Sequence, residues 1–377
     1  MRSDCPNKER CGSCSWSHIP YAKQLQQKLS DINGSFRLKQ LDTEVREIVA
    51  SPKTDHYRNR MDFVIDFEGR VGMREKGKWW RVIDGHTCFL GMERIEELFS
   101  AVRAWAQSAG LSFYDRKAHT GLLRYAVIRA STLGETMVII VTSQPGDEEP
   151  KLGESLVALA ALVALAAPVT LVHSINHTES DVSFGTELHT ISGSGFIEEH
   201  VRGSTYHITP NAFFQTNPCA AARLQDTVAE FAGDLTDKTL LDLYCGSGFF
   251  SVPLAHGAKR TIGIEFIEDA IRDARINAGL NQVEIEFHPA KTEEHDWGQY
   301  DADVVILDPP RMGLHDKTLE DVLRIQPHTI VYVSCHYKNF ARELVRLRTI
   351  YDVKAIRAID MFPHTPHVEL VTKLVKR

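Results

Sequence analysis

The second half of the chain alternates between short apolar runs and longer amphipathic segments. The apolar runs each end at a polar or glycine-bearing turn and span residues 239–245, 260–265, 302–310 and 329–335. Residues 268–280, between two of these runs, place apolar side chains at helical spacing. Strands that alternate with helices predict a parallel sheet with helices on both faces. Only a short loop separates the last two runs, 351–360 and 368–376, so we expect those strands to pair antiparallel.

The first half has a different pattern. Short alternating runs within 57–83 and 122–142 indicate an antiparallel sheet, and residues 93–109 have helical periodicity. The longest apolar stretch, 156–172, is interrupted by Pro168, which leaves about a dozen continuous residues where a membrane span needs ~20. We therefore expect a buried helix followed by a strand there, and no membrane segment.

Composition is that of an ordinary soluble protein of 377 residues, with 43% hydrophobic and 25% charged residues and a net charge of -7. Residues 1–60 nevertheless hold eleven Lys or Arg against seven Asp or Glu. That local excess either serves phosphate contacts or is a solvated surface. The start of the chain has no signal-peptide pattern, so we expect a cytoplasmic protein with reduced thiols. Its seven cysteines then need an explanation other than disulfides.

A glycine-bearing turn, DLYCGSGFF (242–250), follows the first apolar run and opens a helix. Gly246 and Gly248 let the backbone turn tightly and approach a ligand. Glu265 ends the next run, 23 residues after Asp242, where an acidic residue bonds the ribose of a nucleotide. The short G-x-G favours a nucleoside without a pyrophosphate, which indicates S-adenosylmethionine (SAM). The alternative is a turn with a structural role only.

Two further runs end on reactive residue types. Asp308, in LDPPR (307–311), follows one buried strand, and the two prolines after it make a rigid wall. Cys335 follows the next strand and is expected at the same sheet edge, where ligands of such sheets bind. A cysteine taken alone is more often a packing residue. Its position favours a nucleophile, for which a lowered thiol pKa is expected.

The segment DMFPHTPHVEL (360–370) adds a carboxylate and two histidines. Glu369 begins the last run and could accept a proton at the sheet edge. His364 and His367 could bind a metal, but a further ligand at suitable spacing is missing. Metal binding is therefore the weaker interpretation of this segment.

Cysteines also gather near the N-terminus. CPNKERCGSC places Cys5, Cys11 and Cys14 close together, and Cys88 offers a fourth thiol. In a reducing compartment such groups are metal ligands more often than core residues, and four thiolates suit zinc or an iron–sulfur cluster. Cys219 and Cys245, by contrast, are expected to be packing residues.

Together these motifs resemble the RNA uracil-C5 methyltransferase family, whose members make 5-methyluridine in ribosomal and transfer RNA. The resemblance covers nearly the whole chain. It is carried in the family's order by the cysteine segment, HYRNRMDFVI (56–65), GLLRYAVIR (121–129), NAFFQTN (211–217), the glycine turn, DPPRMG, YVSC and FPHTPHVELV.

The resemblance implies an α/β fold with a Rossmann-like SAM-dependent methyltransferase domain. Its sheet would be mostly parallel and seven-stranded, with an antiparallel last strand. An N-terminal and central α+β domain with an iron–sulfur site would precede it. The implied division is an iron–sulfur region at 1–90, a central RNA-binding domain at 91–205 and the catalytic domain at 206–377.

The resemblance also implies roles for individual residues. Cys335 would be the nucleophile and Glu369 the general base. The SAM contacts would be Gln215, Tyr244, Glu265 and Asp308, with Asp242, Gly246 and Gly248 lining the turn. A [4Fe-4S] cluster that shapes an RNA-binding surface would be held by Cys5, Cys11, Cys14 and Cys88.

Two features depart from the family pattern. After the Ser-Cys pair the family commonly has Asn-Pro, where this chain has His336-Tyr337. Many members also begin with an OB-like TRAM domain, whereas this sequence begins at the cysteine segment. The compact architecture is similar to that of the short iron–sulfur enzymes of 23S ribosomal RNA.

By this resemblance the chain is an enzyme that methylates C5 of an RNA uridine through a covalent bond from cysteine to uracil C6. Ribosomal RNA is the preferred substrate and transfer RNA the alternative, with the uridine single-stranded or flipped out. We expect a monomer. A non-catalytic SAM-binding RNA-binding protein is a rival hypothesis that needs neither Cys335 nor Glu369. An amine-methylating enzyme is a second rival, and Arg311, in place of an aromatic residue after DPP, argues against it.

Overall fold

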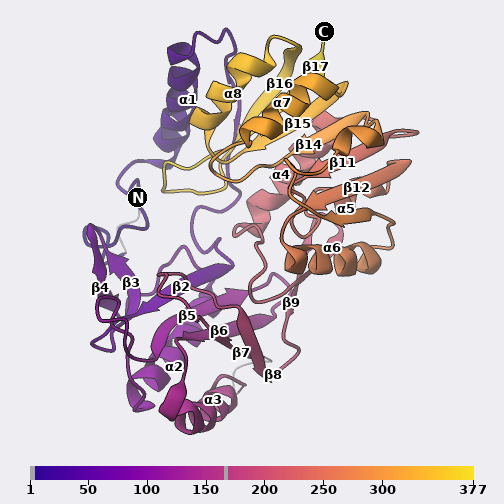
Figure 1. Ribbon diagram of the computed structural model, residues 1–377. Helices are drawn as coiled ribbons and strands as arrows, with labels where there is room; N and C mark the ends of the chain where they lie inside the picture. The colour runs from indigo at the N-terminus through magenta and orange to yellow at the C-terminus, as the bar shows by residue number, and fades with distance from the viewer. Residues whose placement is uncertain (1–4, 165–168) are drawn as a thin grey trace. The chain divides into compact units, whose positions relative to one another are not determined.

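The computed structural model describes residues 5–164 and 169–377, and the chain divides into two compact units (Figure 1). The N-terminal unit consists of residues 1–18, 54–200 and 207–211, and the C-terminal unit of 19–53, 201–206 and 212–377. This division differs from the expected segments 1–90, 91–205 and 206–377, because residues 19–53 pack with the C-terminal unit. Pro168, which was expected to interrupt the apolar stretch, lies outside the described residues.

The C-terminal unit is built on a mostly parallel sheet. Its strands are β1 (Ile48–Val49), β11 (Thr239–Leu243), β12 (Arg260–Glu265), β13 (Glu286–Pro289), β14 (Val304–Leu307), β15 (Thr329–Ser334), β16 (Tyr351–Ile359) and β17 (Glu369–Lys376). Their order is β1-β16-β17-β15-β14-β11-β12-β13. Within it β17 runs antiparallel to both neighbours, which confirms the pairing expected for the last two strands. The sheet is eight-stranded, one strand more than expected, because β1 pairs with the edge of β16.

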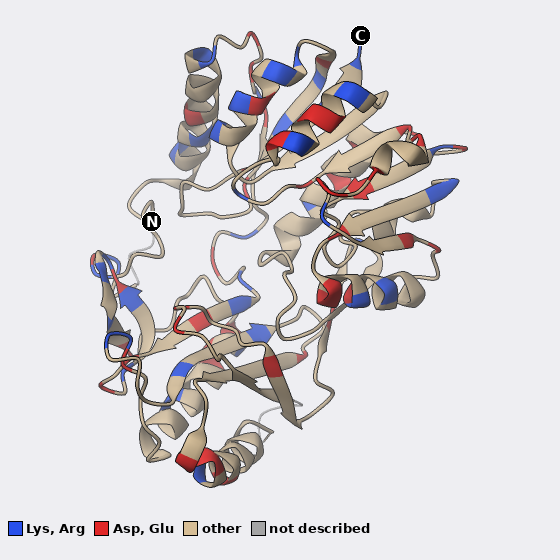
Figure 2. Cartoon of the chain, viewed as in Figure 1, with Lys and Arg blue, Asp and Glu red and all other residues tan. Residues whose placement is uncertain are grey.

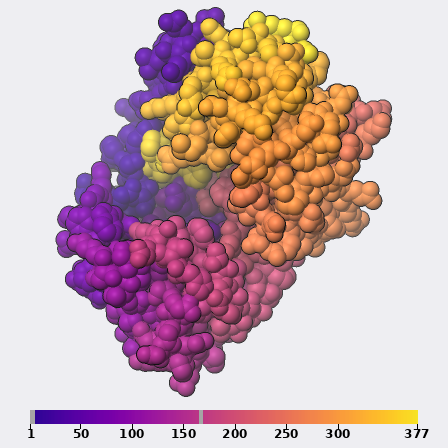
Figure 3. All heavy atoms as spheres, viewed as in Figure 1, coloured from indigo at the N-terminus to yellow at the C-terminus, as the bar shows by residue number. Residues whose placement is uncertain are grey.

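Helices cover both faces of this sheet, as the alternating pattern predicts. They are α1 (Tyr21–Leu38), α4 (Pro218–Ala232), α5 (Ser251–Ala255), α6 (Glu268–Leu280), α7 (Asp316–Ile325) and α8 (Tyr337–Leu347), with a 3-10 turn η2 (Trp297–Tyr300). Helix α1 was not expected from the sequence. It packs on α8, with the rings of Phe36 and Phe340 6.2 Å apart, and Figure 3 shows its indigo atoms beside the yellow C-terminal segments.

The N-terminal unit contains a second, mainly antiparallel sheet. Its strands, in spatial order, are β4 (Lys78–Asp84), β3 (Val71–Glu75), β2 (Arg60–Ile65), β5 (Leu123–Ala130), β6 (Thr136–Thr142), β7 (Val169–Ile175) and β8 (Glu187–Ser192). Only the β6–β7 pair is parallel. The helical elements of this unit are α2 (Glu93–Ser108), η1 (Gly146–Glu148) and α3 (Glu149–Ala164). The helix and strand expected within 156–172 are confirmed as α3 and β7.

The chain passes between the two units several times: at 18–19, at 53–54, within the short hairpin of β9 (Ile197–Val201) and β10 (Ser204–Ile208), and at 211–212. In the N-terminal unit, α2 and α3 share one apolar core with the sheet, built from residues such as Phe63, Phe99 and Leu156. No helix within the described part of the chain is long and apolar enough to cross a membrane.

Candidate active site

Four polar side chains stand at the ends of neighbouring parallel strands in the C-terminal unit. Tyr244 follows β11, Glu265 ends β12, Asp308 follows β14 and Cys335 follows β15. Parallel register brings these strand ends to one edge of the sheet. Ligands of open α/β sheets bind in the crevice outside this edge. The structure therefore brings together residues that lie up to 91 positions apart in the chain, from Tyr244 to Cys335.

Strand β17 brings Glu369 to the same edge from the opposite direction. Ser334, the last residue of β15, pairs with Leu370, so one further step along the antiparallel ladder sets Cys335 opposite Glu369. Glu369 is only 6% exposed, and this burial raises its pKa to about 7. A carboxyl with that pKa is poised to accept or release a proton near neutral pH.

The electrostatics of Cys335 differ from the sequence-based expectation. The pKa of this half-buried thiol is raised to about 11, first by burial and then by the charges of Glu369 and Asp308, with a smaller lowering by Arg311. The expected lowered pKa is therefore wrong for this site. The reason is that one exposed guanidinium does not outweigh burial and two neighbouring carboxyls.

Asp308 shows the same crowding of acidic groups. Burial raises its pKa well above the ordinary value, and Glu369 and Asp242 add to the effect. Carboxyls that repel one another in this way favour a cationic ligand among them, because a positive charge stabilises their ionised forms. The sulfonium of SAM is such a cation, so the charge of the site fits this ligand.

The glycine turn after β11 is held by Glu265. The backbone N–H of Gly246 donates to Glu265 Oε2 at 3.1 Å, and that of Ile267 donates to Oε1 at 2.8 Å. Gly246 has φ +54°, and a Cβ added there would meet no heavy atom within 4 Å. The backbone at Gly246 thus faces open space that a ligand can approach. Gly248, with φ +82°, would instead press a Cβ against Val252 at 2.9 Å.

Asp242 supports the turn from inside. It is fully buried, and its Oδ2 accepts from the backbone N–H of Ser251 at 3.1 Å, which anchors the start of α5. Burial raises the pKa of Asp242 to about 7, against the hydrogen bonds from Ser251. Asp242 therefore stabilises the turn, and nothing exposes it to a ligand.

Tyr244 belongs to the turn, and Gln215 lies in the loop before α4. Tyr244, with φ +66°, is half-buried, and its hydroxyl donates to Thr318 Oγ1 on α7 at 3.4 Å. Gln215 is buried in the loop before α4. Asn217 ties that loop down, because its Oδ1 accepts from Ala220 N at 3.1 Å while its amide donates to a backbone carbonyl at 2.9 Å.

The His336-Tyr337 pair forms a regular start to α8. His336 is the N-cap residue, has extended backbone with φ −141°, and makes no side-chain capping bond. Its N–H donates to Ser334 Oγ at 3.2 Å, and its ring stacks with Tyr337 at 6.3 Å and 12°. The turn after Cys335 therefore forms without the Asn-Pro pair of the family.

Two residues that sequence reasoning missed hold the loop after the Pro pair. Asn339 Nδ2 donates to Arg311 O at 2.8 Å, and buried Glu343 Oε1 accepts from Leu314 N at 3.1 Å. The hydroxyl of Tyr332 donates to the other Glu343 oxygen. The available signal was a pair of polar residues four apart on the inner face of an amphipathic helix.

The four N-terminal cysteines line one small cavity in the N-terminal unit. Its walls include Cys5, Cys11, Cys14 and Cys88. The thiols of Cys14 and Cys88 interact with each other, and the charge of Arg58 acts on both. Within residues 5–164 and 169–377, however, no group of three or more His, Cys, Asp or Glu is arranged to hold a metal ion. The expected iron–sulfur site is thus not shown, although its four thiols stand around one space.

The two histidines of the segment 360–370 and the cysteines Cys219 and Cys245 remain to be placed. His364 Nδ1 lies 3.0 Å from Gln24 Nε2, and its backbone N–H donates to Gln24 Oε1 at 2.8 Å, whereas His367 is exposed. Cys245 is buried in a small apolar cluster, which confirms its packing role. Cys219 is half-buried on α4.

Comparison with known proteins agrees with this arrangement. A family model described as tRNA (Uracil-5-)-methyltransferase matches residues 192–377. An uncharacterized RNA methyltransferase of Caldanaerobacter subterraneus is 36% identical over 385 residues, which span 100% of this chain and 85% of that protein. A tRNA (uracil(54)-C(5))-methyltransferase of Pyrococcus horikoshii is 37% identical over 367 residues, spanning 97% of this chain and 84% of that protein.

A solved structure is similar over nearly the whole chain. It is Pyrococcus abyssi tRNA (uracil-54, C5)-methyltransferase in complex with S-adenosyl-L-homocysteine, with a TM-score of 0.80 and 35% identity over 97% of this chain and 86% of that one. The expected SAM-dependent, Rossmann-like methyltransferase fold is thereby confirmed. The Pyrococcus horikoshii relative and the Pyrococcus abyssi structure are both transfer RNA enzymes, so the preference for ribosomal RNA gains no support from them.

Proposed function

The chain belongs to the tRNA (uracil-5-)-methyltransferase family, and from its site we propose that it methylates C5 of one uridine in transfer RNA through a covalent Cys335 adduct. As a member of this family it is a SAM-dependent RNA methyltransferase that acts on uracil C5. The observation that carries the covalent mechanism is the placement of Cys335 opposite Glu369 at the edge where the other site residues gather.

Uracil C5 is a weak nucleophile, and Cys335 activates it by adding to C6. Once the Cys335 thiol has given its proton to solvent, Sγ adds to C6 and gives C5 enolate character. C5 can then attack the sulfonium methyl group, whose carbon–sulfur bond breaks with the thioether as the leaving group; this is covalent catalysis that divides one difficult step. C5 then carries both a methyl group and a proton. Glu369 removes that proton, the C5–C6 double bond forms again, and Cys335 leaves as a thiolate.

SAM supplies the methyl group when it is bound. Gln215, Tyr244, Glu265 and Asp308 would hold it, since three of them stand at the strand ends and Gln215 lies in the loop before α4. Glu265 would offer its carboxylate to ribose hydroxyls beside the turn that it already braces. Asp308 would attract the sulfonium charge.

Transfer RNA replaces ribosomal RNA as the preferred substrate. The named relatives that match this chain at 35–37% identity carry names for uridine 54 of transfer RNA. Total RNA from cells with and without the gene would be digested, and 5-methyluridine mapped by mass spectrometry. Loss confined to transfer RNA supports the proposal, and loss confined to ribosomal RNA overturns this choice of substrate.

The nucleophile is tested by Cys335→Ala. This variant should form no 5-methyluridine while still binding SAM, which equilibrium dialysis measures. Cys219→Ala, at a half-buried position on α4, is the matched control and should retain full turnover. Methylation by Cys335→Ala at the wild-type rate would exclude the covalent mechanism.

The base is tested by Glu369→Gln. Without a base the methylated adduct cannot release Cys335, so a covalent protein–RNA band should accumulate on a denaturing gel. The band must disappear in the double variant Cys335→Ala, Glu369→Gln. If Glu369→Gln turns over normally and no band forms, another residue removes the C5 proton.

We further propose that Cys5, Cys11, Cys14 and Cys88 hold a [4Fe-4S] cluster. The support is the donor set: four cysteines line one cavity, and four thiolates are the ligands of a [4Fe-4S] cluster. Purified under argon, the protein should contain about four irons per chain. Cys11→Ser should lose iron and brown colour, and Cys219→Ser should keep both. One equivalent of zinc in the wild-type protein would replace the cluster interpretation.

A further inference from the structure

Two tryptophans are exposed side by side on the β3–β4 hairpin of the N-terminal unit. Trp79 is 48% exposed and Trp80 45%, and their rings meet edge to face at 5.8 Å and 84°. They belong to a run of three exposed residues, Trp79 to Arg81, on an edge strand. Large aromatic side chains lose favourable burial when left in water, so an exposed pair indicates a ligand surface.

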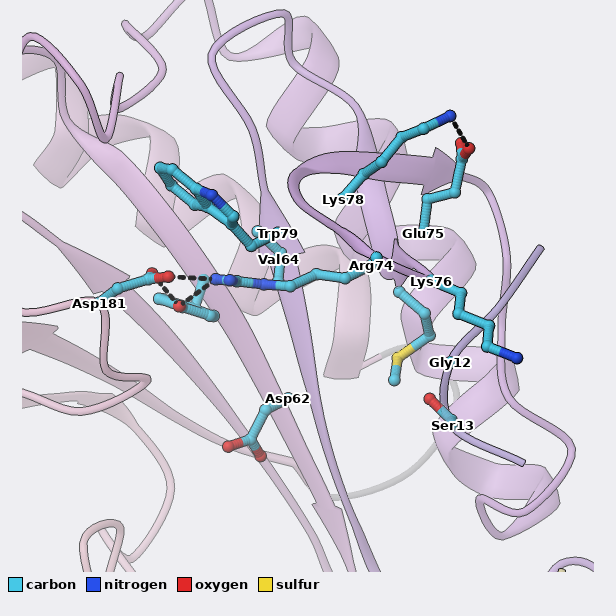
Figure 4. A pocket seen from close by; sticks show the side chains of 13 residues that line it. Gly12, Ser13, Asp62, Val64, Arg74, Glu75, Lys76, Lys78, Trp79 and Asp181 are labelled. Carbon is cyan, nitrogen blue, oxygen red and sulfur yellow. Dashed lines mark hydrogen bonds and ion pairs between the residues drawn. The ribbon is translucent and has the colours of Figure 1, made fainter. Parts of the chain in front are cut away.

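Trp79 also forms one wall of a groove. The groove has a volume of about 720 Å³, within the range of small-ligand sites, and all its lining residues belong to the N-terminal unit. Tyr125 contributes a second aromatic ring to its lining. Figure 4 shows Trp79 and Arg74 on one side of the space and Asp62 across it. Aromatic surface and hydrogen-bonding groups therefore meet in one hollow.

The polar groups of the groove are held in place. Arg74 Nη2 donates to Tyr125 OH at 2.8 Å and to Asp181 Oδ2 at 2.6 Å. Asp62 is held by Arg60 Nε at 2.8 Å, yet its side chain stays 34% exposed. Ordered carboxylates of this kind accept hydrogen bonds from the N–H groups of nucleobase edges.

The β3–β4 hairpin at the rim of the groove is basic, although the lining as a whole has three acidic residues, Asp62, Glu75 and Asp181, for its three basic ones. Between residues 74 and 81 the hairpin carries four Lys or Arg and one Glu, in a protein with a net charge of -7, and Figure 2 shows blue and red positions along the ribbon of β3 and β4. Lys78 Nζ pairs with Glu75 at 2.6 Å. Lys76, at the exposed turn, forms no ion pair with any residue in the described ranges. Its charge is available to a phosphate.

We propose that this groove binds one unpaired nucleotide of the substrate RNA, with the base stacked on Trp79 and the phosphate on Lys76. Single-stranded RNA is recognised through bases that stack on aromatic side chains beside a basic groove. The groove is a second RNA site, formed by a unit that contains none of the active-site residues. It rests on the proposed function only in taking RNA as the ligand.

The N-terminal cysteine loop forms part of the same groove. Gly12 and Ser13, between Cys11 and Cys14, line it. Cys11 forms a β-bridge with Glu75, and the Lys76 N–H donates to the Arg10 carbonyl at 2.7 Å. The loop that carries three of the four thiols therefore forms a wall of the groove. Through this wall, the conformation of the cysteine loop affects the shape of the proposed RNA site.

The test measures binding of the full-length protein to a fluorescently labelled transcript of a transfer RNA T-arm by anisotropy. Trp79→Ala should weaken binding about 5- to 150-fold, since stacking of one base has that range. Trp79→Phe should retain most of the affinity because it keeps a stacking face. Phe67→Ala is the matched control, since Phe67 is 47% exposed in the same unit and does not line the groove.

The rim is tested by the salt dependence of binding. Lys76→Ala should weaken binding at every salt concentration and reduce the slope of log K against log salt by about 1. Lys151→Ala, on α3 of the same unit, removes the same charge outside the groove and should leave the slope unchanged.

The outcomes separate this inference from the proposed function. If Trp79→Ala binds the transcript as tightly as Phe67→Ala, the groove is not an RNA site, and a protein ligand becomes its expected occupant. If Trp79→Ala methylates with raised KM and unchanged kcat, the inference holds. If RNA binding depends on Trp79 but no 5-methyluridine is formed, the proposed function fails while the RNA site stands. Thermal unfolding of each variant confirms that it is folded.

Discussion

Cys335 and Glu369 each hold a proton more tightly in the folded chain than in a free peptide. The thiol pKa rises to about 11, first through burial and then through Glu369 and Asp308, while the pKa of Glu369 rises to about 7 through burial. The nucleophile is thus held in its neutral thiol form at neutral pH. Its reactivity should increase when either neighbouring charge is removed.

The first prediction concerns the rate at which iodoacetamide alkylates Cys335. Since only the thiolate reacts, the rate should rise about tenfold per pH unit from pH 7 to 10. Mass spectrometry of the Cys335 peptide measures it. Glu369→Gln removes a negative charge, lowers the thiol pKa, and should speed alkylation at pH 9. A plateau near pH 8 in the wild-type protein would contradict the raised pKa.

The second prediction concerns stability and Glu369. Folding raises its pKa from 4.5 to about 7, so the folded state binds this proton more tightly than the unfolded state. Its stabilising contribution is therefore complete below pH 4.5 and is lost as pH rises to about 7. The free energy of unfolding of Glu369→Gln minus that of the wild type should therefore be larger at pH 8 than at pH 4.5, by up to about 3 kcal/mol. Urea unfolding of both proteins at both pH values measures these free energies. If the variant and the wild type differ by the same amount at pH 4.5 and at pH 8, the prediction is wrong.

Helix α1 contributes a buried ion pair to the C-terminal unit. Lys28 Nζ lies 2.6 Å from Asp360 Oδ1, and both side chains are fully buried. Tyr21 OH donates to the other oxygen of Asp360 at 2.8 Å. Because Asp360 begins the loop that leads to Glu369, α1 helps to position the start of β17.

The third prediction is that Lys28→Ala destabilises the protein by about 3–5 kcal/mol, because it leaves Asp360 buried without its cation. Lys23→Ala, an exposed lysine of the same helix, should change stability by less than about 0.5 kcal/mol. Urea unfolding compares the two variants. If both variants lower the free energy of unfolding by the same amount, the buried ion pair contributes no more to stability than an exposed lysine.

The C-terminal unit as a whole is assembled from separate parts of the chain. Ile32 and Phe36 of α1 are fully buried in one core with Phe340 and Leu344 of α8. A fragment that starts at residue 206 would expose that apolar face of α8 to water.

The fourth prediction compares two fragments: residues 206–377 alone, and the same residues with 19–53 joined through a flexible linker. The fragment without 19–53 should unfold at a lower temperature, or it should aggregate. Circular dichroism during heating compares the two fragments. Equal, cooperative unfolding of both would show that α1 is dispensable for the fold of this unit.

Much of the C-terminal unit was predictable because its central strands β11, β14 and β15 are buried along nearly their whole length. Continuous apolar runs such as 304–307 and 330–333 mark parallel strands, and the residues after them mark the binding edge. The position of Cys335 and Asp308 at one edge followed from the sequence alone. Helix α1 was missed because its inner face carries Gln24 and Lys28, which break the apolar periodicity that identifies a helix.

By itself, then, the sequence determined the order of strands β11 to β17, the residues at the sheet edge and the family resemblance. Only the tertiary structure decided the pKa of Cys335, because that value depends on charges from Asp308 and Glu369, brought together by strand pairing. It also decided the role of the buried polar residues of α1, whose partners lie more than 300 positions away. The exposure of Trp79 was decided in the same way, because apolar character predicts burial, whereas the position of this residue on the edge strand β4 leaves it exposed.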